Sequence, residues 1–156
     1  MMFLNFLIVI FYFSFIFASK VFAAPFIDNG NGTVKDKATG LVWQKCSNGQ
    51  NATDCSGTAN TSDWTTSITY CTGLTLASKV WRLPNINELK SILDYSKTSS
   101  PMIDTAIFPN TAAGYYWSST TYSPITSSAW YLGFDISTVL QDPKSSPYYV
   151  RCVSGP

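Results

Sequence analysis

The four cysteines are the residues of this chain whose spacing says most about chemistry. They stand at positions 46, 55, 71 and 152, which matches neither the C-x-x-C spacing of zinc sites nor that of a redox dithiol. In an exported protein, cysteines of this kind form disulfides, and three pairings are open. The short polar segment between Cys46 and Cys55 has the character of a loop that needs a local bridge. We therefore expect the disulfides Cys46–Cys55 and Cys71–Cys152.

General acid–base chemistry has few candidates in this sequence. No histidine is present, which removes the usual general base, the Ser-His-Asp arrangement and the commonest metal ligand. Glu88 is the only glutamate, and it lies three residues after Asn85, where it completes a helix cap. We therefore expect no enzyme activity and no cofactor. Acid chemistry by aspartates that folding brings together is the remaining catalytic alternative.

An Asn-Gly repeat runs from Asp28 to Thr33 and has some likeness to a calcium-binding loop. Glycines 30 and 32 occupy positions where such a loop needs oxygen ligands, so the spacing argues against a metal site. Asn-Gly is a strong signal for a tight turn between two strands. We therefore expect a β-hairpin at this repeat.

The first 23 residues form an apolar leader. Its end carries small residues at Val21 and Ala23, the spacing that favours cleavage after Ala23 by signal peptidase. The alternative is an uncleaved membrane anchor, because no lysine or arginine precedes the apolar run. Residues 24–156 then form a single exported domain, located in the periplasm, on the outer surface or in the medium.

The charge balance of residues 24–156 limits the class of partner. Nine lysines and arginines oppose nine acidic residues in this range, so its formal charge is zero. Binding of nucleic acid needs a basic surplus to neutralise phosphates, so we expect no nucleic-acid partner. A domain of this length buries a hydrophobic core of its own.

Apolar spacing predicts two helices followed by several strands. Trp64, Ile68 and Cys71 form a stripe typical of a helix of about three turns. The Asn-Glu cap begins a second helix, which we expect to end within residues 97–100, before Pro101. From residue 115 onward the period is two, as in β-strands. This order indicates an α+β fold with antiparallel sheets covered on one side.

The same alternation predicts a ligand-binding face on the strands. We place Trp117, Trp130 and Cys152 in the core, together with the alternate residues Leu132 and Phe134. The side chains expected to point outward and bind ligand are those of Tyr116, Tyr122, Tyr131, Tyr149 and Arg151. Tyrosine packs well against both sugar rings and protein surfaces, so the face fits a carbohydrate or a protein.

Six motifs occur along the chain in a fixed order. They are the segments 28–36 (DNGNGTVKD), 39–45 (TGLVWQK), 81–89 (WRLPNINEL), 108–111 (FPNT), 116–120 (YWSST) and 150–153 (VRCV). Together they resemble the Lcl C-terminal domain family, named for the globular end of a bacterial collagen-like adhesin. The resemblance runs from about residue 26 to residue 153, and it implies a C-type-lectin-like fold.

The resemblance also implies a binding function. Members resemble adhesins that bind sulfated glycosaminoglycans, so we expect recognition of a glycosaminoglycan-like carbohydrate or another host-surface ligand. The zero charge and the lack of a Gly-X-Y stalk weaken the case for a heparin-like ligand and for collagen-driven trimers. The acidic loop of calcium-dependent lectins is missing after Trp117, so binding should not need calcium.

Two other functions stay open at this point. The chain could be a cell-envelope domain that binds a protein and recognises no sugar. It could also be a fold-related oxidising or sulfatase-maturing enzyme, which would need accessible paired thiols.

Cleavage of the leader gives the first testable prediction. N-terminal sequencing of the exported protein should start at Ala24, because the small residues at the end of the leader match a cleavage site. A protein that starts at Met1 and is recovered only with membranes would contradict this prediction.

Overall fold

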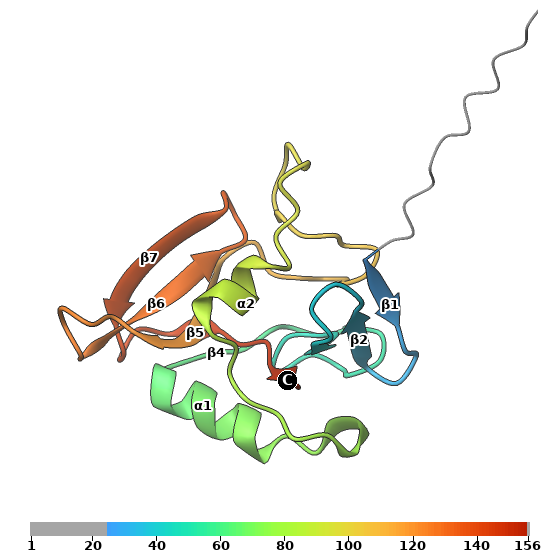
Figure 1. Cartoon of the computed structure of the whole chain (residues 1–156), viewed down its shortest axis with the longest axis horizontal. Coiled ribbons are helices and arrows are strands. Elements are labelled where there is room, and N and C mark those ends of the chain that lie inside the picture. The colour runs from blue at the N-terminus through green and yellow to red at the C-terminus, as the bar shows by residue number, and fades with distance from the viewer. Residues whose placement is uncertain (1–24, 156) are drawn as a thin grey trace, which may run out of the picture.

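The computed structural model describes residues 25–155, so the leader and its predicted cleavage point lie outside the described residues. This range forms an α+β fold with two α-helices and two sheets, as the sequence predicted (Figure 1). The strands are β1 (Phe26–Asp28), β2 (Thr33–Asp36), β3 (Val42–Gln44), β4 (Thr61–Ser62), β5 (Tyr115–Thr121), β6 (Ser128–Gly133), β7 (Thr138–Pro143), β8 (Tyr148–Tyr149) and β9 (Val153–Ser154). The helices are α1 (Trp64–Gly73), the short 3-10 turn η1 (Leu76–Ser78) and α2 (Ile86–Lys90).

The smaller sheet has four antiparallel strands in the order β1-β2-β3-β9. The predicted hairpin joins β1 to β2, where the Asn29 N–H donates to the carbonyl of Thr33 at 2.9 Å. Gly32 is required there, since its φ is +80° and an added Cβ would lie 2.6 Å from the carbonyl oxygen of Ala52. The glycine therefore also lets the loop that contains Ala52 pack closely against the hairpin.

The larger sheet has five strands in the order β4-β8-β5-β6-β7. Its pairs are antiparallel, except that β8 runs parallel to β5, with Tyr149 opposite Tyr116. The register of β5 against β6 shifts between Trp117 and Thr121, which marks a bulge. The parallel pair places the C-terminal segment between β4 and β5.

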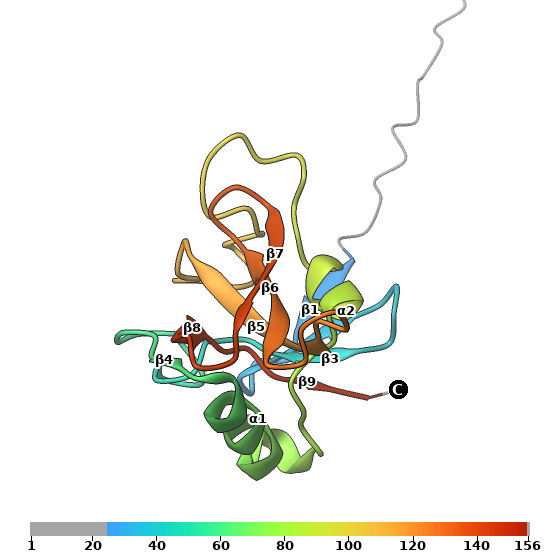
Figure 2. The same cartoon turned by 90° about the vertical axis from the view of Figure 1, so that its left-hand side faces the viewer.

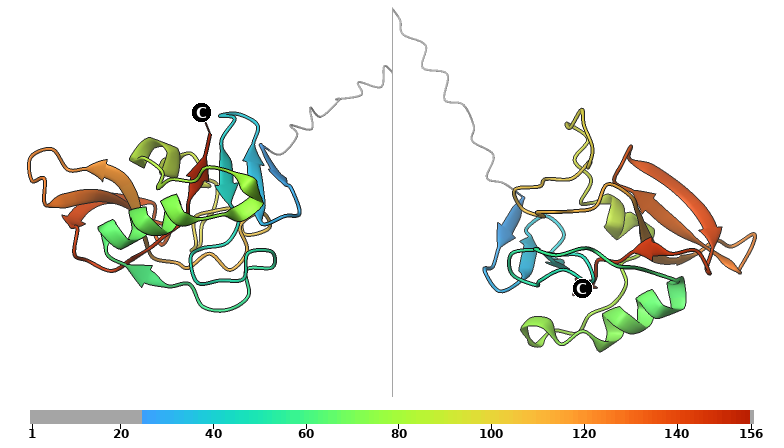
Figure 3. Two further views of the ribbon diagram at one scale, coloured as in Figure 1. Left: turned by 90° about the horizontal axis from the view of Figure 1, so that it is seen from below. Right: turned by 180° about the vertical axis from the view of Figure 1, so that it is seen from behind.

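The two helices cover opposite faces of the larger sheet. Leu89 of α2 lies in one buried cluster with Leu132 and Phe134 of the β6 region. Cys71 of α1 lies in a second buried cluster with Trp117 of β5. Figures 1 and 2 show the two helices on different sides of the strands, and Figure 3 shows α1 in front of them when seen from below. The expectation that this sheet is covered on one side was therefore wrong.

Helix α1 forms as its sequence predicted. Asp63 is the N-cap, and its carboxylate accepts a hydrogen bond from the N–H of Thr66 at 2.9 Å. The predicted stripe faces inward, because Cys71 is fully buried and Trp64 and Ile68 pack beside it. This burial brings Cys71 to Cys152, and both predicted disulfides, Cys46–Cys55 and Cys71–Cys152, are present.

Helix α2 begins as predicted but is much shorter. Both hydrogen bonds of the Asn85–Glu88 capping box are present. The helix ends at Lys90 instead of continuing to residues 97–100. The cause lies at Asp94, whose side chain accepts hydrogen bonds from the N–H and hydroxyl of Ser96, while its own N–H bonds to the carbonyl of Met102. A local Asx turn thus replaces the helical hydrogen bonds there.

The two disulfides should contribute unequally to stability. The loop closed by Cys71–Cys152 spans 81 residues against nine for Cys46–Cys55. Chain entropy assigns about 4.5 kcal/mol to the long loop and about 2.7 kcal/mol to the short one. Thermal unfolding should therefore show a larger drop in Tm for Cys152→Ser than for Cys55→Ser, and the reverse order would contradict this assignment.

The ion pair at the start of α2 should make stability depend on pH. Burial raises the pKa of Glu88, but hydrogen bonds from Arg82 and from the Asn85 N–H outweigh it, so the pKa lies below its usual value. This stabilisation is present above the unfolded-state pKa of about 4.3 and is lost as the pH falls through the folded-state value.

Glu88→Gln isolates this contribution, because glutamine keeps the capping geometry and loses the charge. Urea unfolding at pH 6 and at pH 3 should show a smaller loss of stability in the variant than in wild type. The difference should stay below about 1 kcal/mol, because Arg82 is partly exposed to water. Asn87→Ala, on the same helix, is the control, and an equal change in both variants would contradict the role of the pair.

Candidate functional site

The register of β5 against β6 decides which side chains face the solvent. Trp117 lies opposite Tyr131, and Tyr116 lies opposite Leu132. Directly opposed residues share a face, so Trp117 shares its face with Tyr131. The sequence prediction that Trp117 and Trp130 share a face was therefore wrong. Trp130 is only half-buried, whereas Leu132 and Phe134 are fully buried as predicted.

Tyr116 does not point to solvent, contrary to the sequence prediction. It is fully buried on the face covered by α2, with Phe134 at a ring-centroid distance of 4.9 Å. Its hydroxyl forms a hydrogen bond with the Ser47 hydroxyl at 2.9 Å and accepts the N–H of Ala112 at 3.2 Å. Burial raises the pKa of this phenol, so it stays neutral. Tyr116 is a structural residue.

Arg151 is fully buried as well, and the prediction of an outward guanidinium was wrong. Its side chain points away from Cys152, as the alternation predicted. The side to which it points is also buried, because Phe108 and the cluster under α2 lie there. Its Nη2 donates to the Thr111 hydroxyl at 2.9 Å, and its guanidinium lies 4.8 Å from the centre of the Phe108 ring. Burial lowers the pKa of the guanidinium. Arg151 therefore holds loops together and is out of reach of a surface ligand.

The other predicted residues do not form one surface. Tyr122 packs edge-on against Trp130, with ring centroids 5.2 Å apart. Tyr149 is half-buried against Tyr116 at 5.3 Å. Tyr131 is 7% exposed and lies on the opposite face of the sheet, among other tyrosines. Of the five predicted residues, Tyr131 alone belongs to the cluster described next.

A partly exposed aromatic cluster lies on the face that carries Trp117. Tyr115 is 39% exposed and packs against Tyr131 and Tyr148 at ring-centroid distances of 5.0 and 5.4 Å. Tyr131 and Tyr148 are 4.7 Å apart, and Trp117 supports Tyr148 from below at 4.6 Å. These rings come from β5, β6 and β8, three neighbouring strands or strand ends of one sheet.

Strand β7 adds two side chains to this cluster. Leu140 lies directly opposite Tyr131 and is 51% exposed. Asp142 shares that face, two residues further along, and accepts a hydrogen bond from the Tyr148 hydroxyl at 2.7 Å. We call the surface formed by Tyr115, Tyr131, Leu140, Asp142 and Tyr148 the tyrosine face.

Gly133 and the sheet register fix the tyrosine face locally. Gly133 lies opposite Tyr115, and a Cβ there would come within 3.1 Å of the Tyr115 ring. The absence of this side chain lets the ring lie close over the strand. The alternation had correctly put Tyr115 with Trp117. The sequence analysis missed Tyr115 as a surface residue because it assigned the whole face that carries Trp117 to the core. It made no assignment for Tyr148.

The electrostatics of the tyrosine face combine neutral phenols with a carboxylate. Burial and the hydrogen bond to Asp142 both raise the pKa of Tyr148. Burial, followed by the nearby Tyr115 and Asp142, raises the pKa of Tyr131. These phenols are therefore protonated donors at neutral pH. The arrangement offers apolar ring surface, hydroxyl donors and an acceptor, which are the groups that orient a bound ligand.

Within residues 25–155, no three His, Cys, Asp or Glu side chains gather closely enough to hold a metal ion. The same range contains no helix with the length and apolar character that a membrane crossing requires.

Comparison with known proteins places the chain in a family. The family model described as the Lcl C-terminal domain matches residues 32–154, a range that includes both disulfides and the whole tyrosine face. No curated protein matches the chain. Because the matched range covers well over half of the sequence, the chain belongs to the Lcl C-terminal domain family.

Proposed function

We propose that this chain is an exported binding module, not an enzyme, that recognises an uncharged carbohydrate through its tyrosine face without calcium. Membership of the Lcl C-terminal domain family suggests an adhesin-like extracellular domain. The two disulfides are consistent with export. The observation that carries the finer proposal is the set of mutually packed tyrosines beside Asp142, in which Tyr115 is exposed, Tyr148 is partly exposed and Tyr131 is buried beneath them.

Mutual packing makes the tyrosine rings suitable for binding. Each ring contacts the others at centroid distances of 4.7 to 5.4 Å, so little side-chain freedom remains to be lost when a ligand stacks on them. The C–H face of a sugar ring is apolar and fits such a surface, while the sugar hydroxyls need partners. Asp142 and the tyrosine hydroxyls supply those partners.

The charge of the tyrosine face favours an uncharged glycan over a sulfated one. It contains the carboxylate of Asp142, and Asp135 raises the pKa of Tyr131 from nearby. The first basic residue after β7 is Lys144, whose ammonium lies 4.0 Å above the Trp64 ring and donates to Thr121. Sulfate groups would therefore meet like charge, which opposes the glycosaminoglycan-like ligand implied by the family resemblance.

A protein partner is the second candidate, and Leu140 favours it. This side chain is 51% exposed on β7, which is an edge strand of the larger sheet. An exposed apolar residue on an edge strand next to tyrosines is a common composition for a protein-binding surface. This alternative corresponds to a cell-envelope domain that recognises no sugar.

A glycan array containing uncharged and sulfated saccharides, run beside immobilised matrix proteins, tests the proposal. We expect binding to uncharged saccharides that survives EDTA. For the best saccharide, Tyr115→Ala should weaken binding by roughly thirtyfold, because loss of an aromatic anchor typically costs about 2 kcal/mol. Titration calorimetry measures this change.

Tyr95→Ala is the matched control, because Tyr95 is 69% exposed and packs against none of the rings of the tyrosine face. It should leave affinity unchanged, and both variants should remain folded at the temperature of the titration. Binding to matrix protein alone would support the second candidate instead. Saccharide binding that Tyr115→Ala leaves intact would contradict the assigned site.

A further inference from the structure

Strand β7 is an edge of the larger sheet, and its outer side has no partner strand within residues 25–155. It comes last in the order β4-β8-β5-β6-β7, and it pairs with β6 alone. Figure 1 and the right-hand view of Figure 3 show it at the outer border of the molecule. The opposite edge strand, β4, has two residues, whereas β7 has six. An unpaired strand of this length is a template for pairing with another strand.

One hydrogen bond establishes which backbone groups of β7 point outward. The Lys144 N–H donates to the Ser127 carbonyl at 2.9 Å, so Lys144 bonds toward β6. The register of β6 against β7 continues without a bulge, and bonding directions alternate along an antiparallel pair. Every second residue of β7 before Lys144 therefore also bonds toward β6. The N–H and carbonyl groups of the residues between them, Val139 and Gln141, point away from β6.

The centre of β7 lacks the features that usually keep an edge strand from pairing. Edge strands are protected by charged side chains, by bulges or by proline. From Thr138 to Gln141, β7 has no charged residue, no proline and no bulge against β6. Pro143 stands only at the last position of the strand. The outward groups of Val139 and Gln141 are therefore open to a second strand.

A second copy of β7 fits this edge in one antiparallel register. In this register Leu140 lies opposite Leu140 of the second copy, and Val139 of each copy lies opposite Gln141 of the other. The outward groups of each Val139–Gln141 pair then exchange two hydrogen bonds, one in each direction. All outward backbone groups of these two residues are thereby paired.

The two neighbouring symmetric registers are less favourable. A register centred on Gln141 places Leu140 opposite Asp142 and needs a donor from Pro143, which has no N–H. A register centred on Val139 needs Ser137 to be extended, but Ser137 has a φ of +58° and belongs to the turn before β7. Only the register centred on Leu140 pairs residues that already have strand geometry.

The side chains of the register centred on Leu140 are complementary as well. Leu140 is 51% exposed in the single chain, and in this register it packs against its own copy. Asp142 lies opposite Thr138 of the second copy, so its carboxylate meets a hydroxyl donor and not another carboxylate. On the other face, Val139 lies opposite Gln141. The register therefore covers an exposed apolar side chain and opposes no like charges.

We propose that two copies of this chain pair through β7 in the register centred on Leu140 and form a dimer with one continuous sheet. Directly opposed residues share a face, so the tyrosine faces of both copies lie on the same side of that sheet. The consequence for binding rests on the proposed function. Two saccharide sites on one side bind a repeating glycan more tightly than one site does, because the second contact is made within the same complex.

Leu140→Cys tests the register directly. In the proposed dimer the two new thiols belong to an opposed, non-hydrogen-bonded pair with Cα atoms about 4.5 Å apart, a distance that a disulfide spans. Mild oxidation of the exported variant should therefore give a crosslinked dimer on a non-reducing gel. Peptide mapping checks that the new thiols form the crosslink and that both native disulfides remain.

Thr138→Cys is the matched control for the crosslink. Its two copies are offset by four residues in the proposed register, which places their Cα atoms about 14 Å apart, too far for a disulfide. This variant should stay uncrosslinked under the same oxidation. Crosslinking of Thr138→Cys as efficient as that of Leu140→Cys, or no crosslinking of either variant, would overturn the proposal.

Gln141→Pro tests the outward backbone groups and leaves the tyrosine face intact. The N–H of Gln141 points away from β6, so proline there removes a donor to the second copy and no hydrogen bond within the chain. Sedimentation equilibrium should show a wild-type dimer whose dissociation constant rises at least about tenfold in the variant. Circular dichroism checks that the variant is folded.

The same samples separate dimerisation from saccharide recognition. Binding of a single short saccharide should persist in Gln141→Pro, because each tyrosine face is complete within one copy. A wild type that stays monomeric at millimolar concentration overturns the dimer, whether or not it binds saccharide. A dimer that binds no saccharide contradicts the proposed function and leaves the pairing of β7 in place.

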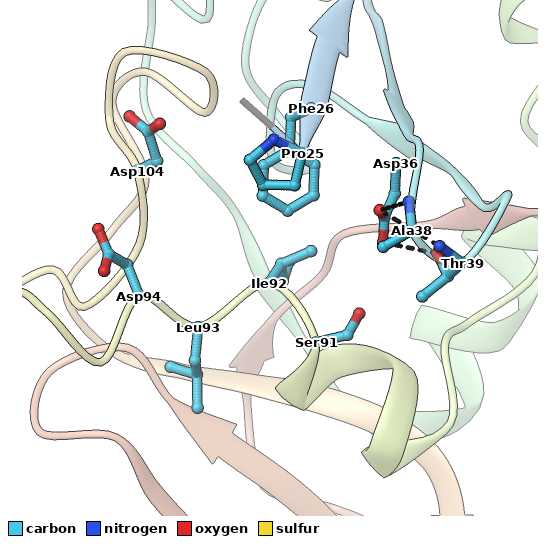
Figure 4. A pocket seen from close by; sticks show the side chains of 10 residues that line it. All are labelled: Pro25, Phe26, Asp36, Ala38, Thr39, Ser91, Ile92, Leu93, Asp94 and Asp104. Atoms are coloured by element: carbon cyan, nitrogen blue, oxygen red, sulfur yellow. Dashed lines mark hydrogen bonds between the residues drawn. The ribbon is translucent and has the colours of Figure 1, made fainter. Parts of the chain in front are cut away.

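A hollow of about 370 Å³ beside α2 offers another surface for contact between copies, and its lining contains no residue of β7 (Figure 4). Ala38→Lys adds a long charged side chain at this hollow, where Ala38 is exposed. Dimerisation should be unchanged in this variant. If Ala38→Lys abolishes the dimer and Gln141→Pro does not, the copies meet at the hollow, and the proposal is overturned.

Discussion

The segment from Tyr148 to Ser154 is the constraint on which the rest of the structure depends. It forms β8 in the larger sheet and β9 in the smaller one, so a single extended stretch joins the two sheets. The Cys71–Cys152 disulfide ties its middle to α1. Its alternating side chains serve both interiors, because Val150 and Cys152 lie in the cluster under α1, while Val153 lies in the cluster under α2. Tyr148, at its start, belongs to the tyrosine face, so the same segment links stability to the candidate site.

Arg151 shows how tightly this segment is enclosed. A fully buried guanidinium without a carboxylate partner is costly, and two of its nitrogens, Nε and Nη1, have no hydrogen-bond partner among the described residues. The Phe108 ring and the hydroxyls of Ser47 and Thr111 offset part of that cost. These contacts draw the loop closed by Cys46–Cys55 and the loop after Phe108 onto the C-terminal segment. Burial of Arg151 therefore costs free energy, and its contacts favour the one arrangement in which these two loops pack on the C-terminal segment.

Local sequence signals were sufficient for part of this fold. The cap at Asp63, the capping box at Asn85 and the hairpin at Gly32 each depend on residues a few positions apart, and all three are present. The alternation within β5 and within β6 was also predicted, but the faces of the two strands were matched wrongly. The polar loop between Cys46 and Cys55 and the buried stripe of α1 were enough to assign the two disulfides.

Long-range features were not predictable in the same way. Which residue of β6 lies opposite Trp117 depends on the bulge in β5, and the parallel pairing of β8 depends on where the chain returns after residue 143. Coverage by both helices then buried Tyr116 and Arg151 and left Tyr115 exposed. The candidate site is therefore formed by Tyr115, Tyr131 and Tyr148. Of the five residues predicted from the sequence, only Tyr131 belongs to it.

Hydrogen–deuterium exchange of a variant without the long disulfide tests the central role of the C-terminal segment most directly. The variant replaces both Cys71 and Cys152 by serine, and the matched control replaces Cys46 and Cys55. Because the segment belongs to both sheets, we expect faster exchange in peptides from β3 and from β5 together in the first variant, with a smaller change confined to the loop in the control. Faster exchange limited to α1 and the last residues, with β3 and β5 as protected as in wild type, would contradict this account.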